Sequence, residues 1–286
     1  MERVFLAPAK INLCLHVLGR RSNGYHELLM LMQPVSLTDR VTLRLLDEPV
    51  FEVECPEVQL AEGEQNIALR AARAVFARVG CGGGVRVRVD KKIPVAAGLG
   101  GGSSDAATVL TGLNGMLGSP LSTESLMCEA LKLGADVPFF VQGTSSWARG
   151  VGERLDPVDK MPAVWYVLVN PGFAVSTAWV YGNLGLTSPG DVAKLPEFSG
   201  LTDDLLRLLH NDLERVTVAR YPEVDRIKRA LLEQGALGAL MSGSGPTVFG
   251  VFSEKDRATA AYERLRSVSG WSVFLVQPLR SPTVYV

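Results

Sequence analysis

The stretch Pro94-Val-Ala-Ala-Gly-Leu-Gly-Gly-Gly-Ser-Ser-Asp-Ala-Ala107 decides the fold, because it places four glycines between a predicted strand and a predicted helix. Glycine has no Cβ atom, so its backbone can approach a ligand closely and adopt positive φ angles. The free amides at the start of the next helix point at such a ligand with the positive end of the helix dipole. We therefore expect this loop to bind a polyphosphate.

The residues on either side of the loop support this context. Before it, Val85, Val87 and Val89 alternate with charged residues, which predicts a half-buried strand. After it, a helix is predicted over 104–117. The hydroxyls of the two serines at 103 and 104 can donate hydrogen bonds to phosphate oxygens or coordinate a magnesium ion. We expect Asp105, in the first helical turn, to hold a cation.

Three other classes of glycine loop are excluded because the residues that define them are missing from this sequence. A P-loop ends in Gly-Lys-Ser/Thr, but no lysine occurs between Lys92 and Lys132. A Rossmann loop needs a third glycine where Ser103 stands, and a βαβ unit where two successive helices are predicted. The protein-kinase motifs His-Arg-Asp and Asp-Phe-Gly are absent from the sequence. A glycine-rich linker without a ligand remains the structural alternative.

Length and composition predict an ordered two-domain protein. The chain has 286 residues, of which 47% are hydrophobic and 21% are charged. The segment DPVDKMP at 156–162 carries two prolines and three charges, which is typical of a domain boundary. We predict one domain over 1–158 and a second over 159–286.

Charge and cysteine usage exclude several classes of partner. The formal net charge is -1, and the 29 basic residues are spread along the chain, so a small-molecule partner is favoured over nucleic acid. Charges interrupt every apolar segment and no secretory leader is recognisable, which predicts a cytoplasmic protein without membrane contact. Four dispersed cysteines without a Cys-x-x-Cys pair indicate reduced thiols. Both a monomer and a homodimer fit the sequence.

Hydrophobic periodicity predicts the remaining elements. Alternating apolar residues predict strands over 4–6, 11–17 and 41–45, while Asn66 is the expected N-cap of a helix that ends at Gly80. A helix over 121–133 precedes Asp136. In the second domain we predict strands over 164–169, 247–252 and 272–276 and helices over 203–209, 222–234 and 254–268. This order is typical of an α+β domain with an antiparallel sheet covered by helices on one face.

The loop resembles the phosphate-binding motif of the galactokinase, homoserine kinase and mevalonate kinase (GHMP) superfamily. Ser242-Gly-Ser-Gly-Pro-Thr-Val-Phe-Gly250 resembles its C-terminal glycine motif and Ala9-Lys-Ile-Asn-Leu-Cys-Leu15 its N-terminal motif. The resemblance implies an α+β two-domain GHMP kinase fold: an N-terminal domain like domain 2 of ribosomal protein S5 and a ferredoxin-like C-terminal domain. It also implies ATP as phosphoryl donor, with Mg²⁺.

Two further segments resemble one branch of the superfamily. They are Arg20-Arg-Ser-Asn-Gly-Tyr-His-Glu-Leu28, with Asn23 where the branch often has aspartate, and Gly134-Ala-Asp-Val-Pro-Phe-Phe140. The resemblance implies phosphorylation of the 2-hydroxyl of a cytidine-diphosphate methylerythritol in non-mevalonate isoprenoid synthesis. The alternatives are a superfamily kinase for homoserine, mevalonate or a sugar, and a nucleotide-binding module without turnover. A serine hydrolase using Ser103, His26 and Asp136 lacks the Gly-x-Ser-x-Gly elbow.

The resemblance also implies roles for single residues. By resemblance, Asp136 is the expected catalytic base, although its position alone indicates a turn residue. Lys10 is the expected partner of Asp136, although its side chain could also extend from the strand to solvent. Asn12, on the same side of that strand, is expected to contact substrate. The expected ATP-binding residues are Pro94, Val95, Ala96, Ala97, Gly98, Leu99, Gly100, Gly101, Gly102, Ser103 and Ser104.

Aromatic residues are the expected cytosine readers. By resemblance, Tyr25 and His26 recognise the base, and Tyr181 supplies a second stacking face; the alternative is ordinary core and surface packing. His16 and His210 lie far apart in the sequence without metal-ligand spacing, so we predict that both are structural.

Overall fold

Two β-sheets and their helices make up the computed structural model, which describes residues 1–22, 24–58, 65–185 and 197–279. Among these residues seven strands form the first sheet, in the order β3-β4-β2-β1-β8, with β5 paired to β2 and β6 paired to β5. The strands are β1 (Glu2–Arg20), β2 (His26–Leu46), β3 (Phe51–Glu54), β4 (Gly84–Asp90), β5 (Ser146–Gly150), β6 (Arg154–Pro157) and β8 (His210–Asn211).

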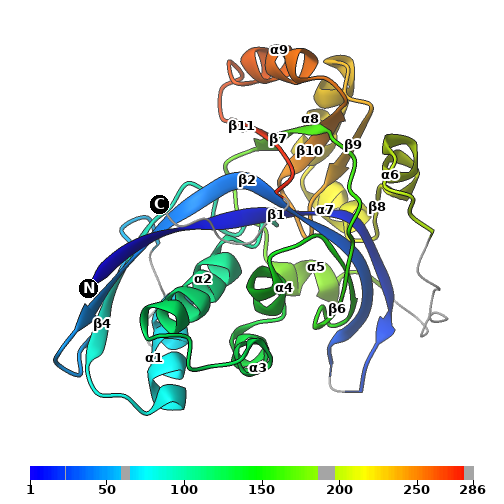
Figure 1. The fold of residues 1–286 in the computed structure, drawn as a ribbon. Coiled ribbons are helices and arrows are strands. Elements are labelled where there is room, and N and C mark those ends of the chain that lie inside the picture. The colour runs from blue at the N-terminus through cyan, green and yellow to red at the C-terminus, as the bar shows by residue number, and fades with distance from the viewer. Residues whose placement is uncertain (23, 59–64, 186–196, 280–286) are drawn as a thin grey trace.

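Four helices cover one face of this sheet (Figure 1): α1 (Ile67–Val79), α2 (Gly101–Met116), α3 (Thr123–Leu133) and α4 (Val137–Gln142). Asn66 caps α1 by accepting a hydrogen bond from the backbone of Ala68 at 2.9 Å, and Gly80 ends that helix in the left-handed conformation. These predictions are confirmed. Helix α2 begins at Gly101, three residues before its predicted start.

The second sheet is antiparallel, in the order β11-β7-β10-β9. Its strands are β7 (Trp165–Asn170), β9 (Gly238–Met241), β10 (Val248–Phe252) and β11 (Ser272–Val276). Helices α8 (Glu223–Glu233) and α9 (Lys255–Leu265) pack on this sheet, as predicted. The opposite face, which carries Tyr166, Leu168 and Phe249, shares a hydrophobic core with Ile11 and Leu31 of the first sheet. The catalytic candidates on β1 are therefore backed by the second sheet (Figure 1).

Short elements connect the two layers. They are α5 (Thr177–Gly182), α6 (Thr202–Leu208) and α7 (Glu214–Arg220). β6 ends the first run of strands at Pro157 and β7 opens the second sheet at Trp165, while β8 returns to pair with β1. The residue boundary at 158 stays a prediction. Strands β3, β5, β6, β8 and β9 and helices α4 and α7 were not predicted, since short segments show too few periods of their pattern.

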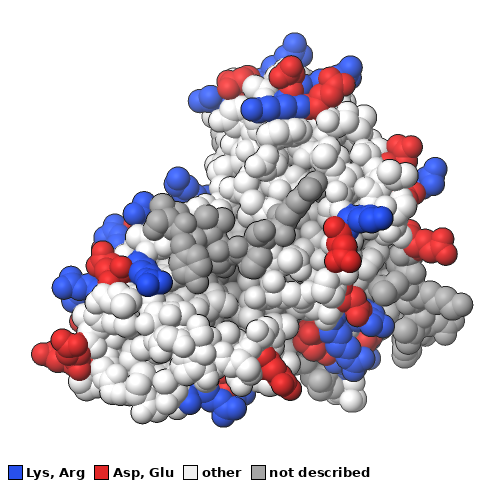
Figure 2. All heavy atoms as spheres, in the orientation of Figure 1, with Lys and Arg blue, Asp and Glu red and all other residues white. Residues whose placement is uncertain are grey.

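On the face in Figure 2 charged side chains of both signs lie mainly at the top and near the edges of the molecule, without a broad area of one sign. The described residues on this face form no basic stripe of the kind that is typical of nucleic-acid binding. Among the helices that the structure describes, none combines the length and apolar character needed to cross a bilayer.

Candidate active site

A β-bulge in β1 determines which side chains face the site. The pairing of β1 with β2 shifts register between Asn12 and Cys14, so Leu13 is an extra residue in the strand. The same cavity is consequently lined by Lys10, Asn12 and Leu15. In a regular strand Leu15, an odd-numbered residue, would point to the opposite side from the even-numbered Lys10 and Asn12. His16 follows on the other face of the strand.

Lys10 is the central side chain of this cavity and is buried. Its Nζ atom donates a hydrogen bond to Asn12 Oδ1, as the predicted shared orientation requires, and lies 3.7 Å from Asp136 Oδ2. A Cβ atom on Gly100 would lie 3.2 Å from Lys10 Cε, and one on Gly243 would lie 3.5 Å from Nζ. The ammonium group is thus close to both glycine segments and to Asp136.

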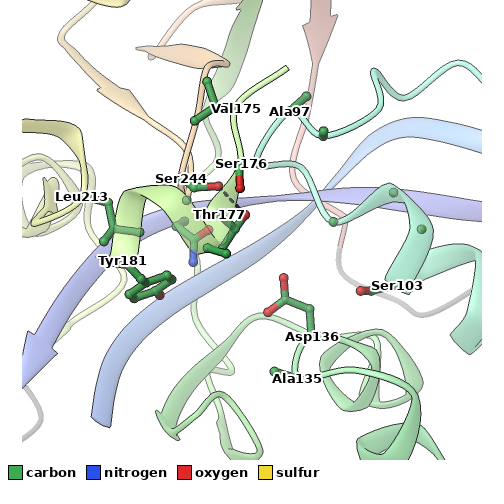
Figure 3. A pocket seen from close by; sticks show the side chains of 18 of the residues that line it. Ala97, Ser103, Ala135, Asp136, Val175, Ser176, Thr177, Tyr181, Leu213 and Ser244 are labelled. Atoms are coloured by element: carbon green, nitrogen blue, oxygen red, sulfur yellow. Dashed lines mark hydrogen bonds between the residues drawn. The ribbon is translucent and has the colours of Figure 1, made fainter. Parts of the chain in front are cut away.

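Asp136 precedes helix α4, at the N-cap position, after the extended Gly134 that ends α3. Its side chain makes no capping hydrogen bond and is 32% exposed. The carboxylate points into the cavity that Ser103 and Thr177 also face (Figure 3). An aspartate that served only as a turn or cap residue would use its carboxylate on the backbone, so this geometry favours a chemical role.

The phosphate loop needs its glycines for two reasons. Gly98 and Gly100 have φ angles of 76° and 70°, which other residues rarely adopt. A Cβ atom on Gly98 would also lie 2.1 Å from the backbone oxygen of Ser242. The N-terminal glycine loop and the C-terminal glycine motif are therefore in direct backbone contact.

Ser242 joins the loop to the catalytic strand. Its Oγ donates a hydrogen bond to the Gly98 carbonyl at 2.9 Å and accepts one from the Asn12 backbone at 3.2 Å. The side chain is fully buried. Sequence reasoning identified the glycine motif that begins at Ser242 but missed this residue, because neither bonding partner is near it in the chain.

Lys91 lies beneath the loop in a buried ion triad. Its ammonium group hydrogen-bonds Asp39 and lies 2.7 Å from Asp105 Oδ2. Asp39 also accepts the backbone N–H groups of Lys92 and Ile93, at 2.5 and 2.8 Å. Asp105 is the fifth residue of α2 rather than a first-turn residue, and its pairing with Lys91 uses Oδ2. Its expected role in holding a bound cation stays a prediction.

Two polar atoms in this region have no partner among the described residues, namely Ser104 Oγ and Asp105 Oδ1. Both atoms are buried, and burial raises the pKa of Asp105 despite the adjacent Lys91. Buried polar atoms are normally paired, and of these two residues only Asp105 lines the cavity.

The aromatic candidates lie together at the cavity wall. The rings of His26 and Tyr181 stack with their centroids 4.9 Å apart, and Tyr25 is 61% exposed. Burial lowers the pKa of His26, and the Arg20 guanidinium lowers it further. Burial raises the pKa of Tyr181, and so does the charge of Asp136. Asn23, the departure from the branch motif, lies outside the described residues.

One cavity of about 1150 Å³ brings the candidates together. Its wall includes every predicted site residue except Leu99 and Ser104, which are buried. Sequence reasoning did not assign several other wall residues, among them Cys55, Val58, Ile67, Thr177 and Ser244. A cavity of this size, with a glycine loop, an ammonium group and a carboxylate on its wall, suits transfer of a phosphoryl group between two bound molecules.

Comparison with known proteins identifies the family. Residues 66–144 match the GHMP kinases N terminal domain and residues 196–269 match GHMP kinases C terminal. A 4-diphosphocytidyl-2-C-methyl-D-erythritol kinase from Syntrophotalea carbinolica is 60% identical over 275 residues, covering 96% of this chain and 98% of its own. The chain belongs to the 4-diphosphocytidyl-2-C-methyl-D-erythritol kinase family of the GHMP kinases.

Other members of this kinase family agree. The enzyme of the same name from Pelobacter propionicus is 50% identical over 273 residues, covering 96% of this chain and 98% of its own. A solved structure of 4-(cytidine 5'-diphospho)-2C-methyl-D-erythritol kinase superposes with a TM-score of 0.79 and 38% identity, over 97% of this chain and 99% of that one. The predicted α+β GHMP kinase fold and the predicted family are confirmed.

Proposed function

We propose that this GHMP kinase transfers the γ-phosphoryl group of ATP to the 2-hydroxyl of 4-diphosphocytidyl-2-C-methyl-D-erythritol, giving the 2-phosphate and ADP. Membership of the family supports this reaction. The location of the active site is supported by one cavity that brings together Lys10, Asp136 and the two glycine segments. The step belongs to the non-mevalonate isoprenoid pathway.

In this proposal Asp136 accepts the proton of the attacking hydroxyl. The hydroxyl oxygen forms a bond to the γ-phosphorus as the bond to the β,γ-bridging oxygen breaks, and ADP carries away that electron pair. Lys10 lies beside the Asp136 carboxylate and offsets the negative charge that develops between the reactants. Asn12 holds Lys10 in place through its Oδ1 atom and faces the substrate.

The phosphate loop is proposed to hold ATP. The cavity is lined by the first residues of α2, Gly101, Gly102 and Ser103, and no acidic residue lies in the first turn to repel phosphate. Mg²⁺ supplies charge neutralisation when it is bound with ATP. The hydroxyl of Ser103 lines the cavity and is a hard oxygen donor, which fits this ion.

We propose that the cytosine base is recognised by Tyr25, His26 and Tyr181. Stacking and edge hydrogen bonds are the interactions that recognise a single base, and these side chains supply both. The rings of His26 and Tyr181 stack on each other, and Tyr25 lines the same cavity.

The decisive experiment is a coupled assay of ADP release with product mass. The protein is incubated with magnesium-ATP and each of three alcohols: the cytidine-diphospho substrate, mevalonate and homoserine. Product from the first alcohol alone, lost in Asp136→Ala, supports both the substrate and the base. ADP release with only a rival alcohol would contradict the assignment of Tyr25 and His26, and no turnover with any alcohol would favour a nucleotide-binding module. The hydrolase alternative has no support, since among the described residues no hydrogen bond joins His26 to Ser103 or Asp136.

A further inference from the structure

Two histidines and an aspartate meet on the side of β1 that faces away from the cavity. They are His16 of β1, His210 of β8 and Asp212, and one ligand atom of each lies within 4.8 Å of the others. His210 Nε2 lies 2.7 Å from Asp212 Oδ1, and His16 Nδ1 lies 4.0 Å from Asp212 Oδ2. The prediction from sequence spacing missed this cluster, because strand pairing creates it.

The backbone holds these three residues in fixed positions. β1 and β8 pair in parallel, with Cys14 opposite His210, and the Asp212 N–H donates to the Leu15 carbonyl at 3.0 Å. The carboxylate of Asp212 accepts the backbone N–H of Val17 at 2.7 Å. Only the side chains of the histidines have freedom to adjust, since His16 is 36% and His210 is 50% exposed.

We propose that His16, His210 and Asp212 bind a divalent transition-metal ion of the Zn²⁺ and Co²⁺ class. Two imidazole nitrogens and one carboxylate form a donor set that these ions prefer, whereas Mg²⁺ prefers oxygen donors alone. The two imidazole rings are now stacked, with an interplanar angle of 19° and centroids 4.4 Å apart. One ring must rotate to share an ion, and the half-exposed His210 has the room to do so. Water completes the coordination on the exposed side.

Such an ion would link the catalytic strand to the C-terminal glycine motif. Asn211, between the two ligands, donates hydrogen bonds to the carbonyls of Met241 and Gly243 at 2.7 and 2.8 Å. Gly243 lines the cavity. Because the three ligands meet only in the folded chain, ion binding stabilises the folded state.

The test uses the full-length chain without a histidine tag, treated with chelator and carrying Cys128→Ser so that its exposed thiol binds no ion. Co²⁺ is titrated without ATP, and visible absorption and Tm are recorded; Zn²⁺ is then added as competitor. We expect one ion per chain, a Kd in the micromolar range, and a Tm rise of roughly 5 °C at about 100 times the Kd.

The variants decide the location. His210→Ala and Asp212→Asn should each weaken Co²⁺ binding about tenfold or more, while His26→Ala, which removes the remaining histidine of the sequence, should leave it unchanged. Circular dichroism checks that each variant is folded. Absence of a Co²⁺ absorption band, or equal affinity in His210→Ala, would show that the cluster is only a hydrogen-bonded histidine pair. The result does not depend on kinase activity, so it is separate from the proposed function.

Discussion

Lys10 Nζ lies 3.7 Å from Asp136 Oδ2, although the two residues come from the first strand and from the start of α4. This places a basic and an acidic side chain together inside a cavity whose other walls are largely uncharged. The same ammonium group is near both glycine segments, so one side chain can serve both the base and the transferred phosphoryl group.

Asp136→Asn should lower kcat by about 10² to 10⁴ with little change in KM for either substrate, because the amide cannot accept the hydroxyl proton. Lys10→Met should have a similar effect. Since the two residues are proposed to act as one unit, the double variant should be no slower than the slower single variant. Steady-state kinetics of the three variants checks this, and additive losses would contradict a shared role.

Gly98→Ala should raise KM for ATP at least tenfold or prevent folding. The left-handed backbone alone costs about 1–2 kcal/mol with a Cβ atom, and that atom would lie 2.1 Å from the Ser242 carbonyl oxygen. Gly82→Ala is the matched control, because its Cβ atom meets nothing within 4 Å. Thermal unfolding and ATP titration distinguish the two variants; equal behaviour would mean that the loop backbone is not constrained as described.

Ser242→Ala should weaken ATP binding and lower stability together. The change leaves the Gly98 carbonyl and the Asn12 N–H without their partner, at a cost of about 1–3 kcal/mol. We expect KM for ATP to rise more than kcat falls, as for a residue that positions the loop. Ser267→Ala removes an exposed hydrogen bond to Arg264 and should be neutral. A variant with reduced Tm but wild-type KM would show a purely structural role.

The substrate KM should depend on pH through His26. Its pKa is lowered from 6.5, first by burial and then by Arg20, so the imidazole is neutral at pH 7. KM for the cytidylyl substrate should therefore stay constant above pH 6.5 and rise below it, because protonation of His26 disturbs cytosine recognition. In the same range the unfolded chain takes up the proton before the folded chain, so the stability contribution of His26 is also lost as pH falls.

Arg20→Gln provides the control for this profile. Removing the guanidinium takes away one cause of the lowered pKa, so the rise in KM should begin at a higher pH than in the wild type. KM for ATP should show no corresponding break in either protein. An unchanged profile in Arg20→Gln would mean that another group controls the dependence.

The sequence by itself determined the phosphate loop, the strand and helix on either side of it, and the family. These features depend on residues that are neighbours in the chain: the glycines of 98–102, the alternation at 85–89 and the cap at Asn66. Backbone conformation and burial on one side set local patterns of this kind, so they can be predicted from residues that are neighbours in the sequence.

Only the tertiary structure decided how distant segments meet. A bulge of one residue at Leu13 turned Leu15 to the cavity and His16 away from it, and no periodicity signals such an insertion. Asp105 pairs with Lys91 beneath the loop, and His16 meets His210 through pairing of β1 with β8. Ser242 reaches Gly98 and Asn12 across the same packed layers. Such contacts arise from sheet register and close packing between segments, which residues adjacent in sequence do not encode.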